Sequence, residues 1–240
     1  MNPIIAMWAH QRAMSTAFLR MMIERGDVTV IHEPLVTLID EGEVALPDGR
    51  GGQVVVRSEQ ALFAQMRELA RDKPVFFKDT VEHRYDYLFE HPEDVADIEH
   101  TFIVREPRRT ISSMYNMKPT ITSPEIGYEH LHEIFELARR MSGRVPAVVS
   151  ADRMIEDPAA AIRRWCDRVG LPFIERALTW KAEDRPEWSR TRKWHMDVIN
   201  STGFTRPSKT YSDTVETNPV LQGFYSYHQP FYQQIVQHAL

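Results

Sequence analysis

The sequence predicts a doubly wound α/β fold whose central sheet is mostly parallel and is covered by helices on both faces. Residues 3–9 form an unbroken apolar run, a pattern typical of a strand that is buried on both sides. A helical pattern follows at residues 15–25 and a β-branched run at residues 28–31. This strand–loop–helix–strand order recurs as far as residue 170, so we expect a three-layer architecture of helix, sheet and helix.

The remaining core elements follow from local patterns and from residues that start or stop helices. Ser58 begins one helix, Pro107 occupies the first turn of another, and Gly170 with Pro172 ends the last. In chain order the expected elements are a helix at 58–71, strands at 75–77 and 100–104, helices at 107–117 and 124–141, a strand at 147–149, and a helix at 158–169.

The last 55 or so residues have a different character, because many aromatic side chains are scattered there among polar ones. We interpret them as irregular segments that cover the sheet, followed by a terminal helix. Residues 1–240 are thus expected to form a single domain, with a core at about 3–175 and covering segments at about 180–240. Some covering aromatics are expected to line a ligand pocket and others to pack on the sheet.

Composition excludes several classes of protein. With 240 residues, 42% of them hydrophobic, the chain can bury a full core. Its one cysteine, Cys166, cannot form an internal disulfide, which argues against a secreted disulfide scaffold and favours a reducing, cytoplasmic setting. The formal net charge of −5 argues against a general nucleic-acid binder. We find no targeting or membrane segment.

The loop between the first strand and the first helix carries the first candidate site. A helix N-terminus presents free backbone N–H groups and the positive end of the helix dipole, which together attract phosphate or sulfate. Here Arg12 adds a charge, and Ser15 and Thr16 add hydroxyl donors. The glycines and lysine of a nucleotide-triphosphatase P-loop are absent. An alternative remains open, in which Ser15 merely caps the helix and Arg12 is solvated.

A second candidate anion site lies where the strand at 100–104 runs into the helix at 107–117. Arg105 sits at the carboxyl end of that strand, where ligands of open α/β sheets bind, and Ser113 lies two helical turns further on. Arginines in a first helical turn oppose the dipole, which favours an anionic partner over a row of solvated charges.

These two segments resemble the cofactor motifs of the sulfotransferases that use 3′-phosphoadenosine-5′-phosphosulfate (PAPS). Arg12, Ser15 and Thr16 match the loop that grips the 5′-phosphosulfate in that family. The segment 105–113, with Arg105 and Ser113, matches the one that grips the 3′-phosphate, and residues 148–172 are similar to the fifth strand and following helix. The resemblance spans about residues 3–175 and implies a P-loop-like fold, PAPS as sulfuryl donor, no metal, and a hydroxyl acceptor.

The first loop departs from the family pattern at two positions. Ala13 and Met14 stand where the family usually places a small pair such as Ser-Gly. Because methionine favours ordinary backbone angles, we expect a loop geometry different from one that contains glycine.

The resemblance suggests two candidates for the base that takes the proton of the acceptor hydroxyl. Glu33 directly follows the second strand and matches a glutamate used by some bacterial and heparan-type sulfotransferases. Its neighbour His32 is of the residue type most able to titrate near neutral pH. Cytosolic sulfotransferases instead use a histidine after the third strand, where this chain has Thr80, with His83 three residues later. We favour Glu33, with His83 second, over the interpretation of Glu33 as a simple turn residue.

Lys78 closes the third predicted strand and matches the family lysine that contacts the bridging oxygen or the transferring sulfuryl group. Its charge would stabilise the leaving-group anion, whereas a lysine at a strand end is otherwise merely solvated. The ten histidines form no metal-binding motif, so no metal site is predicted.

The sequence therefore predicts a PAPS-dependent sulfotransferase that acts on a small-molecule hydroxyl acceptor, with neither nucleic acid nor membrane as partner. The identity of the acceptor and homodimer formation are left open. Two rival hypotheses remain: a nucleotide or small-molecule kinase with a degenerate phosphate loop, and a non-catalytic nucleotide-binding domain.

Overall fold

A five-stranded parallel sheet forms the centre of the chain in the computed structural model, which describes residues 1–185, 188, 192–206 and 209–240. The strand order is β2-β5-β1-β6-β7, with every neighbouring pair parallel. The strands are β1 (Ile4–Ala9), β2 (Thr29–His32), β5 (Val75–Thr80), β6 (Glu99–Val104) and β7 (Ala147–Ser150). After β1, the chain places β2 and β5 on one side of it and then β6 and β7 on the other. The doubly wound α/β prediction is therefore confirmed.

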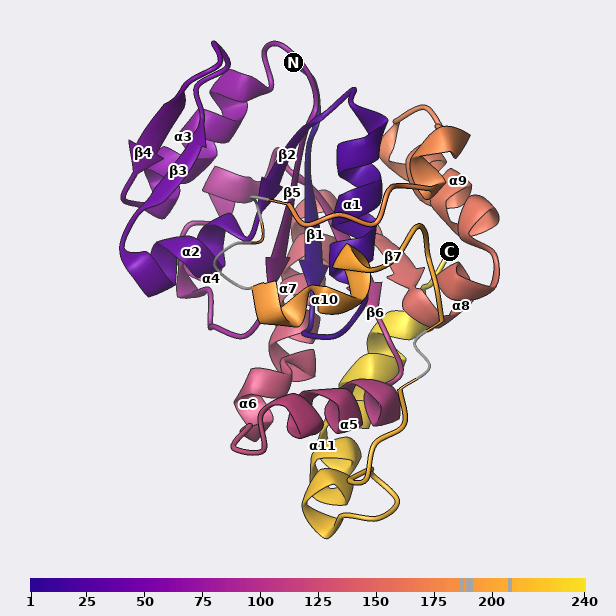
Figure 1. Cartoon of the computed structure of the whole chain (residues 1–240). Coiled ribbons are helices and arrows are strands. Elements are labelled where there is room, and N and C mark those ends of the chain that lie inside the picture. Colours follow the sequence, from indigo (N-terminus) through magenta and orange to yellow (C-terminus); the bar gives the residue numbers. More distant parts are fainter. Residues whose placement is uncertain (186–187, 189–191, 207–208) are drawn as a thin grey trace.

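Two layers of helices enclose the sheet, as Figure 1 shows. Alternate residues of β1 point to opposite faces, and each set belongs to a separate apolar cluster. Ile5, Met7 and Ala9 pack with α1 (Ser15–Arg25) and α9 (Pro158–Val169). The other face packs with α3 (Glu59–Leu69), α5 (Pro107–Met117), α7 (Tyr128–Ser142) and α11 (Pro219–Val236). The continuous apolar run of β1 is therefore explained by burial on both sides.

Several short elements lie outside the predicted set. They are α2 (Pro34–Glu41), the hairpin of β3 (Val44–Pro47) and β4 (Gln53–Val56), α4 (Asp86–Glu90), the 3-10 turn η1 (Pro92–Val95) and α8 (Ala151–Glu156). The hairpin strands have four residues each and the helices have eight or fewer. Elements this short contain too few residues for a hydrophobic periodicity to identify them in the sequence.

The prediction of one helix over residues 124–141 is wrong, because Gly127 divides it into α6 (Ser123–Ile126) and α7. Gly127 has a φ of +84°, and a Cβ at this position would lie 2.9 Å from Val81 Cγ2 and 3.0 Å from the Val81 carbonyl oxygen. Glycine is needed both for the left-handed backbone and for the close approach of the two loops.

The C-terminal segments are irregular before a terminal helix, as predicted. They contain the 3-10 turns η2 (Glu175–Leu178) and η4 (Arg192–Trp194), then α10 (Met196–Ile199) and α11. The short helix α10 contacts α1 and lies near the ends of the strands (Figure 1). Within the described residues, no helix combines the length and hydrophobicity needed to cross a bilayer.

Candidate active site

A cavity of about 450 Å³ opens at the carboxyl ends of β1, β2, β5 and β6. Of the eight residues that the sequence assigns to the site, six line it: Arg12, Ser15, Thr16, Glu33, Lys78 and Arg105. The covering segment, defined here as residues 192–206 and Lys209, supplies much of the opposite wall. Trp194 is the one Trp, Tyr or Phe among the described lining residues. Other aromatic residues of the C-terminal part, residues 180–240, pack elsewhere, as Trp180 does against Phe204.

The N-terminus of α1 points into this cavity. The first helical hydrogen bonds run from the amides of Ala17 and Phe18 to the Met14 carbonyl, at 3.1 and 3.2 Å. The amides of Ser15 and Thr16 precede these bonds at the helix start, where N–H groups have no intrahelical partner. Together with the helix dipole they form a site suited to an anion.

Backbone strain is concentrated around the cavity. Among the described residues, three non-glycine residues have positive φ angles: Arg12 (63°), Met14 (67°) and Glu33 (45°), and all three line the cavity. The expectation that Met14 keeps ordinary backbone angles is wrong, since Met14 is left-handed at the position where glycine would be easiest. Strained non-glycine residues cluster at ligand sites when the surrounding packing enforces them.

Arg12 joins three parts of the chain across the site. Its Nε donates to Ser113 Oγ (3.0 Å), one terminal nitrogen donates to the Trp194 carbonyl (3.0 Å), and the other pairs with Asp197 Oδ2 (2.7 Å). The guanidinium thus links the first loop to α5 and to the covering segment. Ser113 itself is buried behind Arg12, outside the cavity lining, and also accepts a hydrogen bond from the Tyr211 hydroxyl (3.0 Å).

Arg105 is 7% exposed, and its Nε is buried with no hydrogen-bond partner among the described residues. Burial lowers the pKa of its guanidinium. Its backbone is held on both sides, because its amide donates to His10 Nε2 (3.0 Å) and its carbonyl accepts from the Tyr128 hydroxyl (2.5 Å). A buried cationic nitrogen without a partner indicates a place for an anionic ligand.

His10 fixes the turn in front of Arg105, a role that the sequence did not suggest. Burial lowers the pKa of this ring to about 3, so the ring is neutral. Because Nε2 accepts from the Arg105 amide, Nδ1 carries the proton and donates to the Gln11 carbonyl (2.9 Å).

Glu33 and Lys78 form a buried ion pair on the cavity wall. Lys78 Nζ lies 2.5 Å from Glu33 Oε1, and the two side chains are 1% and 7% exposed. Burial by itself would raise the pKa of Glu33, but the charge of Lys78, and then that of His32, outweigh burial and lower it. The strand β5 runs on to Thr80, so Lys78 lies within the strand and does not close it as predicted.

Asp79 holds the helix that carries Glu33 at its start. Its two carboxylate oxygens accept from the amides of Leu35 (3.0 Å) and Val36 (3.2 Å), in the first turn of α2. Burial raises the pKa of Asp79 to about 8. This bond between β5 and α2 fixes Glu33 opposite Lys78, and the sequence analysis did not single it out.

His83 lies outside the lining of the cavity, and its Nε2 is 2.8 Å from Asp40 Oδ1 at a third-exposed position. The geometry therefore supports the choice of Glu33 before His83, which stays a prediction.

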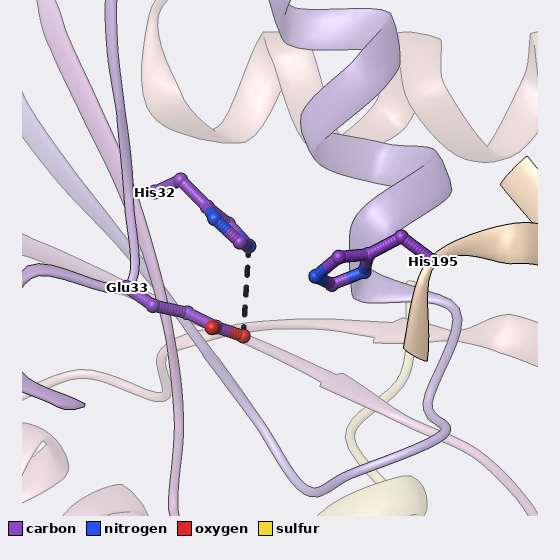
Figure 2. A group of neighbouring side chains, drawn as sticks. All are labelled: His32, Glu33 and His195. Carbon is purple, nitrogen blue, oxygen red and sulfur yellow. Dashed lines mark ion pairs between the residues drawn. The ribbon is translucent and has the colours of Figure 1, made fainter. Parts of the chain in front are cut away.

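Two histidines flank Glu33, as Figure 2 shows, and one of them comes from the covering segment. His32 Nε2 lies 3.6 Å from Glu33 Oε1, and the rings of His32 and His195 meet edge to face with centroids 5.1 Å apart. One potential ligand atom from each of the three residues lies within 4.8 Å of the others. The ammonium of Lys78 on the same carboxylate oxygen disfavours a second cation there.

The fold and the site together define a P-loop-like α/β protein whose first strand–helix turn has the groups suited to an anion. The family model described as "Sulfotransferase domain" matches residues 3–239, so the chain belongs to the sulfotransferase domain family. This confirms the resemblance inferred from the two motifs.

Among solved structures, the sulfotransferase domain of the Synechococcus PCC 7002 olefin synthase is 14% identical, with a TM-score of 0.57 over 95% of this chain and 94% of that one. A sulfotransferase from Alicyclobacillus acidocaldarius is 12% identical, with the same TM-score over 100% and 98%. These two likenesses support the fold. A curated relative, branched-chain-amino-acid aminotransferase-like protein 2 of Arabidopsis thaliana, is 26% identical over 211 residues. That match covers 86% of this chain but 37% of the relative's length.

Proposed function

We propose that the protein transfers a sulfuryl group from PAPS to a hydroxyl group of a small-molecule acceptor. The observation that carries this proposal is the buried Glu33–Lys78 pair, which lies on the wall of the cavity into which the N-terminus of α1 points. A candidate base (Glu33), a cation (Lys78) and a candidate anion site (the N-terminus of α1) thus line the same cavity. The covering segment supplies part of the wall, which supports the further proposal that residues 1–240 work as a single domain.

The donor would be bound by the groups at the ends of β1 and β6. The amides of Ser15 and Thr16 and the Thr16 hydroxyl would hold the 5′-phosphosulfate at the N-terminus of α1. Arg105, whose buried Nε has no hydrogen-bond partner in the described part of the chain, would hold the 3′-phosphate. Arg12 would act mainly by keeping the covering segment closed over the donor, because its three nitrogens already bind Ser113, Trp194 and Asp197.

The chemistry follows from the two members of the ion pair. The acceptor oxygen attacks sulfur, the new O–S bond forms as the bond from sulfur to the phosphate oxygen breaks, and 3′-phosphoadenosine-5′-phosphate (PAP) leaves. Glu33 takes the hydroxyl proton, and Lys78 stabilises the charge that grows on the departing oxygen. As Lys78 turns toward that oxygen, the main charge that lowers the pKa of Glu33 moves away, and the carboxylate becomes a better base.

The two rival hypotheses make different demands on the site. A kinase needs a phosphate-loop lysine and an acidic ligand for Mg²⁺, and the first loop contains no lysine. A non-catalytic domain would bind the nucleotide without turning it over.

The test measures thermal stabilisation by PAPS, PAP, ATP and ATP–Mg²⁺, and PAP release from PAPS with a library of hydroxyl acceptors. We expect stabilisation by PAPS and PAP above that by ATP, and acceptor-dependent PAP release. Preference for ATP–Mg²⁺ would support the kinase, and tight PAP binding without turnover on any acceptor would support the binding domain.

A further inference from the structure

His195 occupies a position that links the covering segment to the donor site. It directly precedes α10, and its side chain is buried, with 4% of the residue exposed. Its Nδ1 lies 3.0 Å from Thr16 Oγ1, in the first turn of α1. The ring also lines the cavity and faces His32 and Glu33 (Figure 2).

The contact with Thr16 restricts where the Thr16 hydroxyl can point. Burial, and next the charges of Lys78 and His32, lower the pKa of His195 to about 3, so the ring is neutral at neutral pH. A neutral imidazole has one N–H donor and one acceptor nitrogen. If Nδ1 accepts, the Thr16 hydroxyl donates its hydrogen bond to the ring and cannot donate one to a ligand in the cavity. If Nδ1 donates, that proton is free to point toward an anion.

A bound sulfate or phosphate group accepts hydrogen bonds and donates none when fully ionised. Such a group on the N-terminus of α1 therefore favours the arrangement in which His195 donates to Thr16 and Thr16 donates to the anion. The two bonds then form a chain that polarises the hydroxyl toward the donor.

The covering segment is held so that His195 stays over Thr16. On either side of His195, the Trp194 carbonyl and the Asp197 carboxylate bind Arg12, at 3.0 and 2.7 Å. Asp197 also pairs with Lys209 Nζ at 2.5 Å. These contacts anchor the segment to the loop that carries Thr16.

We propose that His195 is a positioning residue that directs the Thr16 hydroxyl toward the anionic group of the donor. The inference rests on the proposed function, because it assumes that an anionic donor binds at this end of α1. It assigns a role in donor binding to a residue of the covering segment, and it makes the placement of that segment beside Thr16 a condition for a complete donor site.

The experiment is a double-mutant cycle between His195→Ala and Thr16→Val. Its readouts are the Kd of PAP by calorimetry, kcat and KM for PAPS, and Tm. We expect each single variant to weaken PAP binding and to reduce kcat/KM for PAPS by about tenfold, the scale of one directed hydrogen bond. The double variant should lose no more than either single one, because both changes break the same chain of bonds.

Conservative variants separate positioning from packing. An Asn side chain places an N–H near the position of Nδ1, whereas a Gln side chain reaches toward that of Nε2. His195→Asn should thus recover activity to within about threefold of wild type, and His195→Gln should resemble His195→Ala. The matched control is His91→Ala, at an exposed histidine outside the cavity lining, which should change neither Kd nor kcat.

Three outcomes would overturn the proposal. The first is that the losses of PAP affinity and of kcat/KM in the double variant equal the sum of the two single losses in free energy. The second is that His195→Asn recovers no activity. The third is that His195→Ala lowers kcat/KM more than a hundredfold and does so equally in the Thr16→Val background. If the wild type binds PAP but turns over no acceptor, the proposed function fails while the cycle in Kd still decides the role of His195. If the wild type neither binds PAP nor turns over PAPS, both fail.

Discussion

Replacing Lys78 by Met should destabilise the fold by an amount that the ion pair allows us to estimate. Methionine keeps an unbranched stem of similar size, and the lysine side chain is 1% exposed. The change leaves the buried Glu33 carboxylate without its nearest cation, 2.5 Å away. Breaking a buried pair on one side costs about 3–5 kcal/mol. In a chain of this length each kcal/mol lowers Tm by about 2–4 °C, so we expect Tm to fall by about 6–20 °C.

The loss should depend on pH with a definite sign. In the wild type the pKa of Glu33 is lowered, so its pairing with Lys78 contributes stability above the ordinary glutamate pKa of about 4.3, and this is lost as pH falls through the lowered value. In Lys78→Met the largest charge that lowers the pKa of Glu33 is absent and burial, which raises it, remains. We therefore expect the pKa of Glu33 to rise and the folding of the variant to weaken as pH rises. The stability gap between the two proteins should therefore narrow in acid.

The assay is urea unfolding at pH 4 to 8 for Lys78→Met, Glu33→Gln and the double variant. The double variant should be more stable than Lys78→Met, because no uncompensated charge remains buried. Turnover of Lys78→Met should fall by about a hundredfold or more, while PAP affinity changes only modestly. A gap independent of pH, or a double variant no more stable than Lys78→Met, would refute the reasoning. Equal losses in binding and turnover would make Lys78 a ground-state anchor.

Four further outcomes are expected. PAP should bind about ten- to a hundredfold more tightly than 5′-AMP in calorimetry, and Arg105→Ala should abolish the difference, because charge-assisted contacts contribute about 1.5–3 kcal/mol; equal affinities in the wild type would contradict the assignment. Glu33→Gln should lower kcat by about 10²–10⁴-fold with PAP binding unchanged, and His83→Ala should cost much less; the reverse order would move the base to His83. Asp79→Ala should destabilise the fold by about 1–2 kcal/mol in urea through loss of the α2 cap, and an unchanged midpoint would contradict this. Gly127→Ala should cost more than about 1 kcal/mol through its left-handed backbone and the contact with the neighbouring loop; a neutral change would show that the loops relax.

The sheet and its main helices could be predicted because each carries a local signal. Strands buried on both faces read as unbroken apolar runs, and the helices α1, α5 and α9 have the predicted bounds. The break at Gly127 was missed because it depends on the close approach of residue 81, which is distant in the sequence. Six of the predicted site residues line the cavity. They could be found because each follows a strand or lies within one, and the carboxyl ends of parallel strands share an edge of the sheet.

The residues that complete the site could not be found in this way, because their roles depend on contacts between distant segments. His195 meets Thr16 across 179 positions, and Arg12 meets Asp197 across 185. No local pattern marks either contact, since the covering segment has no regular strand–helix alternation.

The loop between β1 and α1 departs from the family pattern at Ala13 and Met14, and this departure is compatible with an anion site. Met14 adopts the left-handed conformation, which costs a non-glycine residue of order 1–3 kcal/mol. Its side chain packs against the apolar cluster between α1 and the sheet, and Ala13 beside it is fully buried. Burial of apolar surface offsets the strain at about 25 cal/mol per Å². A glycine would make the turn without strain but also without this anchor, so here packing and not backbone freedom holds the N-terminus of α1 open toward the cavity.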